Sequence, residues 1–124
     1  MSNTIVYGIP NCDTVKKARA WLDEHGVPHT FHDFKKQGVP AAELDRWLAS
    51  AGWESVVNRR GTTWRQLDEA TRESVVDNAS ARQVLLDNPS LIKRPVVQWP
   101  AKARGEPTVG FDAKAWEPLA AKAR

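Results

Sequence analysis

A short apolar run that leads through a turn into an amphipathic helix is the feature that most constrains the fold of this chain. Residues 4–8 are β-prone and end at a glycine, which predicts a buried strand. Pro10 ends that strand, and apolar residues then recur at helical spacing over about residues 12–25, before Gly26. A second strand is predicted over residues 29–34. This succession predicts a βαβ unit with a right-handed crossover and parallel strands.

The middle of the chain, about residues 40–90, is predicted to be helical. Apolar residues share one helix face after Pro40, a proline that the first turn of a helix tolerates. Two shorter helices are predicted over residues 71–77 and 80–87. Ser80 is of a type that commonly caps helices, so we expect it to cap the second of them.

The last third of the chain returns to strands. Residues 96–99 and 108–111 are predicted to form a hairpin, and Asp112 is expected to cap a final helix. The order is then β-α-β, several helices, β-β and α, which predicts an α/β fold with a four-stranded mixed sheet. A length of 124 residues suits a single domain over residues 1–124. The segment of about residues 40–90 would be a helical insertion within it.

Composition excludes several classes of protein. The chain is 41% hydrophobic and 27% charged, which argues against disorder. No apolar run approaches the ~18–20 residues of a membrane span, and no signal peptide is visible, so we expect a cytoplasmic protein. The single cysteine excludes an internal disulfide, and the three histidines lack the spacing of a metal site. A net charge of +3 suits a small anionic ligand better than nucleic acid.

Cys12 is the position with the clearest chemical meaning. It follows the first predicted strand directly and stands at the start of the first predicted helix. Helix N-termini stabilise negative charge, so a cysteine there can have a pKa lowered from ~8.5 and act as a nucleophilic thiolate. The alternative is a buried cysteine that packs as a small hydrophobic residue.

Arg94 and Pro95 stand immediately before a predicted strand. An X-Pro bond is tolerated there in the cis form, although only ~5% of such bonds are cis. Pro95 could equally be an ordinary first residue of a strand, and Arg94 a solvated surface cation.

Arg59 and Arg60 precede a glycine and two threonines. Such a segment can bind an anion, because arginine forms paired hydrogen bonds and glycine lets the backbone approach closely. From these residues alone, a charged loop that faces solvent is the favoured reading.

Taken together, three segments resemble the arsenate reductase-like (ArsC/Spx) family, a branch of the thioredoxin-like fold. The resemblance runs from Ile5 to about the final helix, which is nearly the whole chain. It rests on the segments Tyr7-Gly8-Ile9-Pro10-Asn11-Cys12-Asp13-Thr14, Asn58-Arg59-Arg60-Gly61-Thr62 and Leu91-Ile92-Lys93-Arg94-Pro95.

The resemblance implies a role for each of these residues. Cys12 would be the nucleophile, and Arg94, ahead of a cis Pro95, would help to hold the thiolate and an oxyanion. One arginine of the pair Arg59 and Arg60 would do the same, with Arg60 preferred. Asn11, next to the cysteine, belongs to the same set of anion- or glutathione-binding residues. No metal and no bound cofactor are implied, and glutathione would be a co-substrate.

Three departures from the family pattern narrow the expected activity. Val15 removes the C-x-x-C switch of thioredoxins and of the Spx regulators. Gly8 stands where the glutaredoxin-coupled arsenate reductases carry a histidine, and Phe111 stands near the place of their third arginine. The chain is therefore more similar to a branch for which glutathione-dependent thiol reduction has been proposed.

The expected function is that of a glutathione-dependent thiol oxidoreductase with one cysteine nucleophile. Its expected partners are glutathione or a glutaredoxin, with a small anionic or disulfide substrate and with neither a membrane nor nucleic acid. The alternatives are a Spx-like regulator that binds RNA polymerase, a true arsenate reductase and, least favoured, a basic nucleic-acid-binding module.

Overall fold

The computed structural model describes residues 4–124, which fall into two compact units. One unit combines the residues up to Gln37 with Arg94–Arg124, and the other is Gly38–Lys93. The ends of the second unit lie close to those expected for the helical insertion. That the whole chain forms a single domain stays a prediction.

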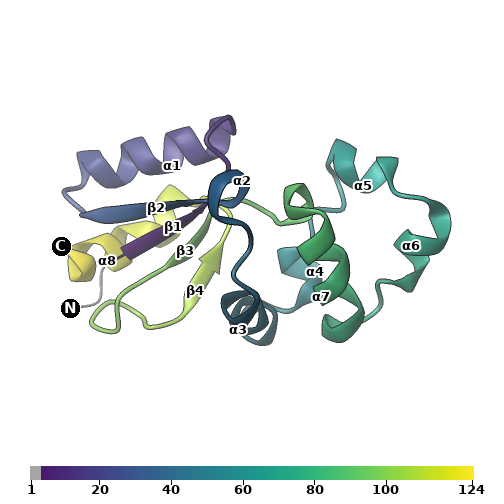
Figure 1. Cartoon of the computed structure of the whole chain (residues 1–124). Helices are drawn as coiled ribbons and strands as arrows, with labels where there is room; N and C mark the ends of the chain where they lie inside the picture. The colour runs from purple at the N-terminus through teal and green to yellow at the C-terminus, as the bar shows by residue number, and fades with distance from the viewer. Residues whose placement is uncertain (1–3) are drawn as a thin grey trace. The chain divides into compact units, whose positions relative to one another are not determined.

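A four-stranded sheet in the order β2-β1-β3-β4 forms the centre of the first unit (Figure 1). Its strands are Thr4–Gly8 (β1), His29–Asp33 (β2), Val96–Gln98 (β3) and Pro107–Val109 (β4). β1 pairs with β2 in parallel and with β3 antiparallel, and β3 pairs antiparallel with β4. The predicted four-stranded mixed sheet is confirmed.

Two helices pack their apolar side chains against the sheet and so form the core of the first unit. They are α1 (Asp13–Glu24) and α8 (Ala113–Ala123). Val6 and Val97 are partners in the sheet, and both belong to a buried cluster that includes Leu22 of α1 and Trp116 of α8. Because these residues come from both ends of the chain, the cluster ties the two ends into one unit.

Most elements of this unit begin and end within about one residue of the prediction, but β4 ends at Val109 instead of Phe111 and the second strand ends before Phe34. Asp112 caps α8 as expected, since its carboxylate accepts the N–H groups of Lys114 and Ala115. Phe34, however, does not end the second strand but begins a short helix, α2 (Phe34–Gln37). The reason is local: Asp33 Oδ1 accepts the Lys35 N–H at 2.8 Å, which turns the chain out of the strand.

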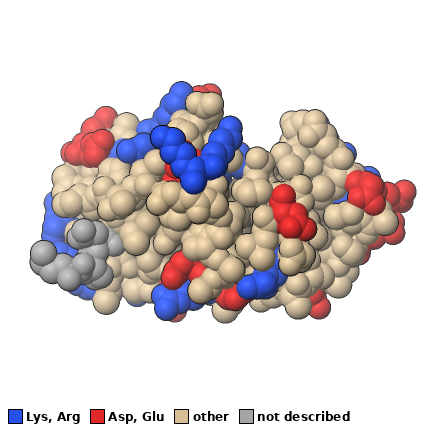
Figure 2. Space-filling view, viewed as in Figure 1, with Lys and Arg blue, Asp and Glu red and all other residues tan. Residues whose placement is uncertain are grey.

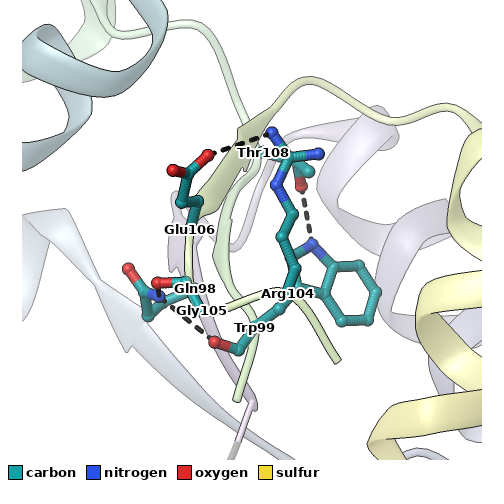
Figure 3. A network of polar contacts seen from close by, with 6 residues as sticks. All are labelled: Gln98, Trp99, Arg104, Gly105, Glu106 and Thr108. Carbon is teal, nitrogen blue, oxygen red and sulfur yellow. Dashed lines mark hydrogen bonds and ion pairs between the residues drawn. The ribbon is translucent and has the colours of Figure 1, made fainter. Parts of the chain in front are cut away.

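The hairpin of β3 and β4 is fastened by polar side chains (Figure 3). Trp99 Nε1–H donates to Thr108 Oγ1 at 2.9 Å, and Gln98 Nε2–H donates to the Gly105 carbonyl at 3.1 Å. Arg104 pairs with Glu106 at 3.8 Å in the connecting loop. These contacts fix the predicted hairpin at its loop end.

The second unit is helical, as expected, but contains more short helices than the sequence suggested. Its helices are α3 (Ala41–Ala51), α4 (Trp53–Val56), α5 (Thr62–Gln66), α6 (Glu69–Ser74), α7 (Asn78–Asp87) and the 3-10 turn η1 (Pro89–Leu91). α4 and α5 were not predicted, and α6 begins and ends earlier than the expected helix over residues 71–77. Within residues 4–124, no helix is both long and apolar enough to cross a membrane.

Ser80 has a different role from the one expected. The N-cap of α7 is Asp77, whose carboxylate accepts the Ser80 N–H at 2.8 Å. The Ser80 hydroxyl lies 3.1 Å from the Asp77 backbone N–H and accepts it in return. Ser80 is thus the third helical residue of a capping box, and α7 begins two residues earlier than predicted.

Candidate active site around Cys12

Cys12 lies at the point where the chain leaves the sheet and enters α1. It is the N-cap residue, with extended backbone angles (φ −97°, ψ 122°), and its carbonyl accepts the Lys16 N–H at 2.9 Å. Its own N–H donates to the Ile9 carbonyl at 3.3 Å and closes the turn through Asn11. Asn11 is exposed in this turn, and the Cys12 side chain is half-buried. The thiol therefore stands at the helix N-terminus that the sequence predicted.

The surroundings of Cys12 favour its thiolate. Partial burial raises the pKa of Cys12, but the Val15 N–H and the Arg94 guanidinium both donate hydrogen bonds to the sulfur and lower it. The positive charge of Arg94 and the Thr14 N–H act in the same direction, so the pKa lies below its usual value. Each of these groups stabilises negative charge on sulfur, in the manner of a helix N-terminus with a nearby cation.

The chain places Arg94 beside Cys12 through the pairing of β3 with β1. Tyr7 is paired with Val96, so the residues just before β3 lie at the carboxyl end of β1. The Arg94–Pro95 peptide bond is cis, as the family resemblance implied. The buried Pro95 carbonyl also accepts the Gly110 N–H at 2.8 Å, which fixes this segment to the residue that follows β4.

Gly8 and Val15 are packed against one another beneath the cysteine turn. A Cβ carbon on Gly8 would lie 2.9 Å from Val15 Cγ2, which is closer than carbon atoms normally approach. Val15 is fully buried. Two departures from the family pattern, the missing histidine at position 8 and the missing cysteine at position 15, therefore occupy one spot in the structure.

Phe111, which the resemblance puts near the place of the family's third arginine, packs against aromatic rings. Phe111 follows β4 and lies against Trp116 and Trp21, with ring centroids 4.9 Å and 6.3 Å apart. Arg104 does not replace that arginine, because Gln98 pairs with Pro107 and the intervening loop leaves the sheet at the end opposite Cys12. Within the first unit, Arg94 is the arginine that contacts the thiol.

Exposed lysines surround the edge of the sheet where Cys12 lies. Gly8 and Asp33 are register partners, so α1 and α2 both begin at this edge. Lysine and arginine gather over the beginning of α1 and over α2 (Figure 2). We call the four exposed lysines the cationic patch; they are Lys16, Lys17, Lys35 and Lys36. The sequence alone did not single out this patch, because α2 was not predicted.

Arg59 and Arg60 belong to the second unit, in the loop between α4 and α5. Both are exposed, and they line a cavity of about 400 Å³ together with Glu54, Asn58 and Lys93. A charged loop between helices was the favoured reading of the sequence, and the place and exposure of the two arginines agree with it. Their predicted approach to Cys12 stays a prediction. Glu54 and Lys93 were missed, although Lys93 is part of the segment that carried the resemblance.

Comparison with known proteins extends over all of these segments. A model of the family described as the ArsC family matches residues 7–119. A solved structure named YffB protein is 46% identical, with a TM-score of 0.86, over 98% of this chain and 100% of that chain. The solution structure of an arsenate reductase (ArsC) related protein from Brucella melitensis is 48% identical, with a TM-score of 0.70, over 94% of this chain and 92% of that chain.

A weaker likeness links the chain to regulators. The global transcriptional regulator Spx of Staphylococcus haemolyticus is 27% identical over 90 residues, which cover 71% of this chain and 67% of the regulator. Arsenate reductase-related proteins and Spx regulators are the two kinds of relative that the motifs around Cys12, Arg60 and Arg94 indicated.

Proposed function

This chain belongs to the ArsC family, and we propose that it is a thiol oxidoreductase in which Cys12 is the nucleophile and glutathione is the reductant. The observation that carries the proposal is the hydrogen bonding of the Cys12 sulfur by Arg94 and by the Val15 N–H. A cysteine with a lowered pKa has a larger thiolate fraction near neutral pH, and the thiolate is the reactive form.

The proposed reaction reduces a mixed disulfide between glutathione and a second thiol. The Cys12 thiolate attacks the glutathione sulfur, the disulfide bond breaks, and the second thiol leaves as a thiolate that takes a proton from water. A free glutathione thiolate then attacks the glutathione sulfur bound to Cys12. Oxidised glutathione leaves, Cys12 returns as a thiolate, and one disulfide has been exchanged for another.

The single cysteine supports an external reductant. The chain has one cysteine, and position 15, three residues after it, is valine. No second thiol of this chain can therefore resolve the intermediate, so glutathione or a glutaredoxin must do so. A cytoplasmic location, which is part of this proposal, would supply both.

The charges around the thiol support an anionic substrate. The cationic patch lies at the same edge of the sheet as Cys12, and Arg94 contacts the sulfur itself. Fixed positive charge raises the local concentration of anions and stabilises a leaving thiolate. We therefore expect small anionic disulfides to react faster than neutral ones.

A glutathione-coupled assay tests the proposal. The wild-type protein is mixed with reduced glutathione and the mixed disulfide of glutathione and 2-mercaptoethanol, and the oxidised glutathione formed is measured. Mass spectrometry follows one glutathione adduct on Cys12. The proposal requires that Cys12→Ser abolish both signals, and turnover by that variant at the wild-type rate would overturn it.

Two of these relatives support two alternative functions. Arsenate reduction is favoured by the Brucella melitensis relative, and Spx-like binding of RNA polymerase by the regulator's likeness. Arsenate in place of the disulfide tests the first, and we expect it to be the poorer substrate because Gly8 and Phe111 supply no donor. Capture of RNA polymerase subunits by the immobilised protein would favour the second.

A further inference from the structure

The cationic patch consists of exposed lysines that form no ion pair within residues 4–124. This holds for each of its members, Lys16, Lys17, Lys35 and Lys36. Asp33 precedes the second pair of lysines, but its Oδ1 accepts the Lys35 backbone N–H at 2.8 Å and its side chain is buried. That oxygen is engaged by the backbone and not by an ammonium group. The four ammonium groups are therefore open to a charged ligand from solution.

The charges of α1 are not arranged to stabilise the helix itself. A helix dipole favours anions near the N-terminus and cations near the C-terminus. Asp13, the first residue of α1, follows that rule. Lys16 and Lys17, however, lie in the N-terminal half of α1, whereas its last turn carries Asp23 and Glu24 and no basic residue. The position of these lysines is therefore better explained by a ligand at that end of the helix than by helix stability.

The patch lies beside the thiol, and both belong to the first unit. The Lys16 N–H donates to the Cys12 carbonyl at 2.9 Å, so Lys16 stands one helical turn beyond the cysteine on the same side of α1. α2 begins directly after Asp33, whose register partner is the last residue of β1. Lys35 and Lys36 thus lie at the edge of the sheet where the cysteine turn begins, and basic side chains cover the start of both helices (Figure 2).

The spread of the lysines over two helices suits a ligand with several negative charges. An exposed lysine gains little from one ion pair in water, because both charges are well solvated and the side chain must be ordered. Several lysines that act on one ligand add their attractions and raise the rate of encounter. Charge on the reacting sulfur, by contrast, is already met by Arg94 and by the Val15 N–H. The patch therefore suits negative charge that lies away from the disulfide but belongs to the same molecule.

We propose that the disulfide reduced at Cys12 belongs to a protein, in which acidic residues that flank a glutathione-bearing cysteine dock on the cationic patch. This inference rests on the proposed function and names its substrate class. The Cys12 thiolate attacks the glutathione sulfur, the disulfide bond breaks, and the cysteine of the substrate protein leaves as a thiolate that takes a proton from water. A free glutathione thiolate then attacks the adduct, Cys12 returns as a thiolate, and oxidised glutathione leaves. A nucleic acid would match the charge but has no disulfide, so an acidic protein meets both requirements.

Glutathionylated peptides test this substrate class. Each peptide carries one central cysteine joined to glutathione, with glutamates on both sides in one peptide and glutamines in the other. The wild-type chain is assayed with reduced glutathione, and the released peptide thiol is measured by chromatography to obtain kcat/KM. We expect the acidic peptide to be the better substrate by about tenfold or more at low salt, because fixed charge accelerates encounter. The ratio should fall towards one as sodium chloride is added.

Paired lysine variants locate the docking surface. One double variant replaces the two patch lysines of α1 by glutamine, and another replaces the two of α2. Each should lower the ratio of the two kcat/KM values. The control Lys102→Gln with Lys122→Gln removes the same charge from the loop between β3 and β4 and from the end of α8, and should keep the wild-type ratio. Far-ultraviolet circular dichroism checks that each variant is folded.

Binding without chemistry separates this inference from catalysis. The isotope-labelled full chain carrying Cys12→Ser is titrated with the acidic peptide, in which serine replaces the cysteine, and backbone amide chemical shifts are followed by NMR. We expect shifts at the start of α1 and in α2, and none in the loop between β3 and β4. A single-stranded oligonucleotide of equal charge is the second probe. Tighter binding of the oligonucleotide than of the peptide would overturn the inference and assign the patch to nucleic acid.

The kinetic results also have outcomes that contradict the inference. Equal kcat/KM values for the two peptides, or a ratio that both patch variants retain, would overturn it and leave the proposed function intact. Failure of the proposed function has a different appearance, because neither peptide would then leave a glutathione adduct on Cys12, even though the acidic peptide still shifts the amides of α1 and α2.

Discussion

Gly8 and Val15 fit together so tightly that neither position is independent of the other. A Cβ carbon on Gly8 would lie 2.9 Å from Val15 Cγ2, and the branched Val15 side chain is fully buried. Gly8 is not among the glycines with positive φ, so its backbone would accept a side chain and the conflict is one of space alone. A side chain at position 8 and a branched side chain at position 15 therefore compete for the same space in this chain.

We expect Gly8→Ala to destabilise the protein by about 1–3 kcal/mol, the usual cost of overpacking a buried site. In Val15→Ala the same change at position 8 should cost far less, because the obstructing methyl group is absent. Chemical denaturation of the four proteins of this double-mutant cycle measures the difference. Additive free energies would show that the two positions do not compete for space.

Val15→Cys should convert the protein to a two-cysteine mechanism. The new thiol would stand three residues after Cys12 in the first turn of α1, where it can attack the glutathione adduct and form an internal disulfide. Mass spectrometry after oxidation with glutathione disulfide should then show loss of two hydrogens instead of a glutathione adduct. Val15→Ala, with the same loss of bulk but no thiol, is the control that should keep the adduct, and a persistent adduct in Val15→Cys contradicts the prediction.

Arg94→Ala should raise the pKa of Cys12 towards the free-cysteine value of ~8.5 without unfolding the chain. The physical reason is the loss of both a hydrogen bond and a positive charge at the sulfur. The rate of iodoacetamide alkylation as a function of pH measures the change. Arg104→Ala is the matched control, because Arg104 lies in the hairpin loop at the other end of the sheet.

Two other results for Arg94→Ala would contradict this prediction. If Arg94→Ala loses its cooperative thermal transition, the arginine is needed for the fold. If the alkylation profile stays unchanged in a folded variant, the guanidinium does not stabilise the thiolate.

The stability of the protein should depend on pH through Cys12. A pKa that is lower in the folded state gives a stabilisation that is fully present above the unfolded-state value and is lost as the pH falls through the folded-state value. We therefore expect the free energy of unfolding of the wild type, relative to Cys12→Ser, to rise as the pH increases from below the folded-state pKa of Cys12 to the unfolded-state value of ~8.5. A flat difference over this range would contradict the lowered pKa.

The cationic patch should accelerate reactions of Cys12 with anionic reagents only. Replacing Lys16, Lys17, Lys35 and Lys36 by glutamine should slow the reaction with the dianion of Ellman's reagent more than the reaction with neutral iodoacetamide. Added salt should reduce the difference between wild type and variant, because it screens exposed charges. Lys122→Gln, an exposed lysine near the end of α8, serves as the control. Equal slowing of both reagents would point to a change in structure instead of charge.

The parts of this fold that are visible in the sequence are those encoded by local pattern. The run of residues 4–8, the spacing of Val15 and Leu22 and the cap at Asp112 each determine an element without help from distant residues. α2 was missed because the turn into it depends on a hydrogen bond that Asp33 Oδ1 accepts from the Lys35 N–H, which a strand pattern does not reveal. α4 is only four residues long, and so short a helix is set by its context more than by helix propensity.

The candidate site was also predictable only where it depends on a local sequence pattern. Cys12 at the start of a helix is a local pattern, whereas the contact between Cys12 and Arg94 depends on the register of β1 with β3. Only the family resemblance joined these two residues before the structure did. Glu54 was missed because a single carboxylate in a helical region forms no recognisable sequence motif. The cavity that it lines depends on the bridge between Val57 and Ile92, which joins segments distant in the sequence.

The distribution of tryptophan makes the protein its own optical reporter. Of its six tryptophans, Trp21, Trp99 and Trp116 belong to the first unit and Trp47, Trp53 and Trp64 to the second. Replacing the three of one unit by phenylalanine leaves the intrinsic fluorescence of the other as its only indole emission. Two such proteins, followed through the same denaturant series, would reveal whether both halves lose their structure together or one before the other. Coincident unfolding curves from the two proteins would show that the two units unfold as one cooperative domain.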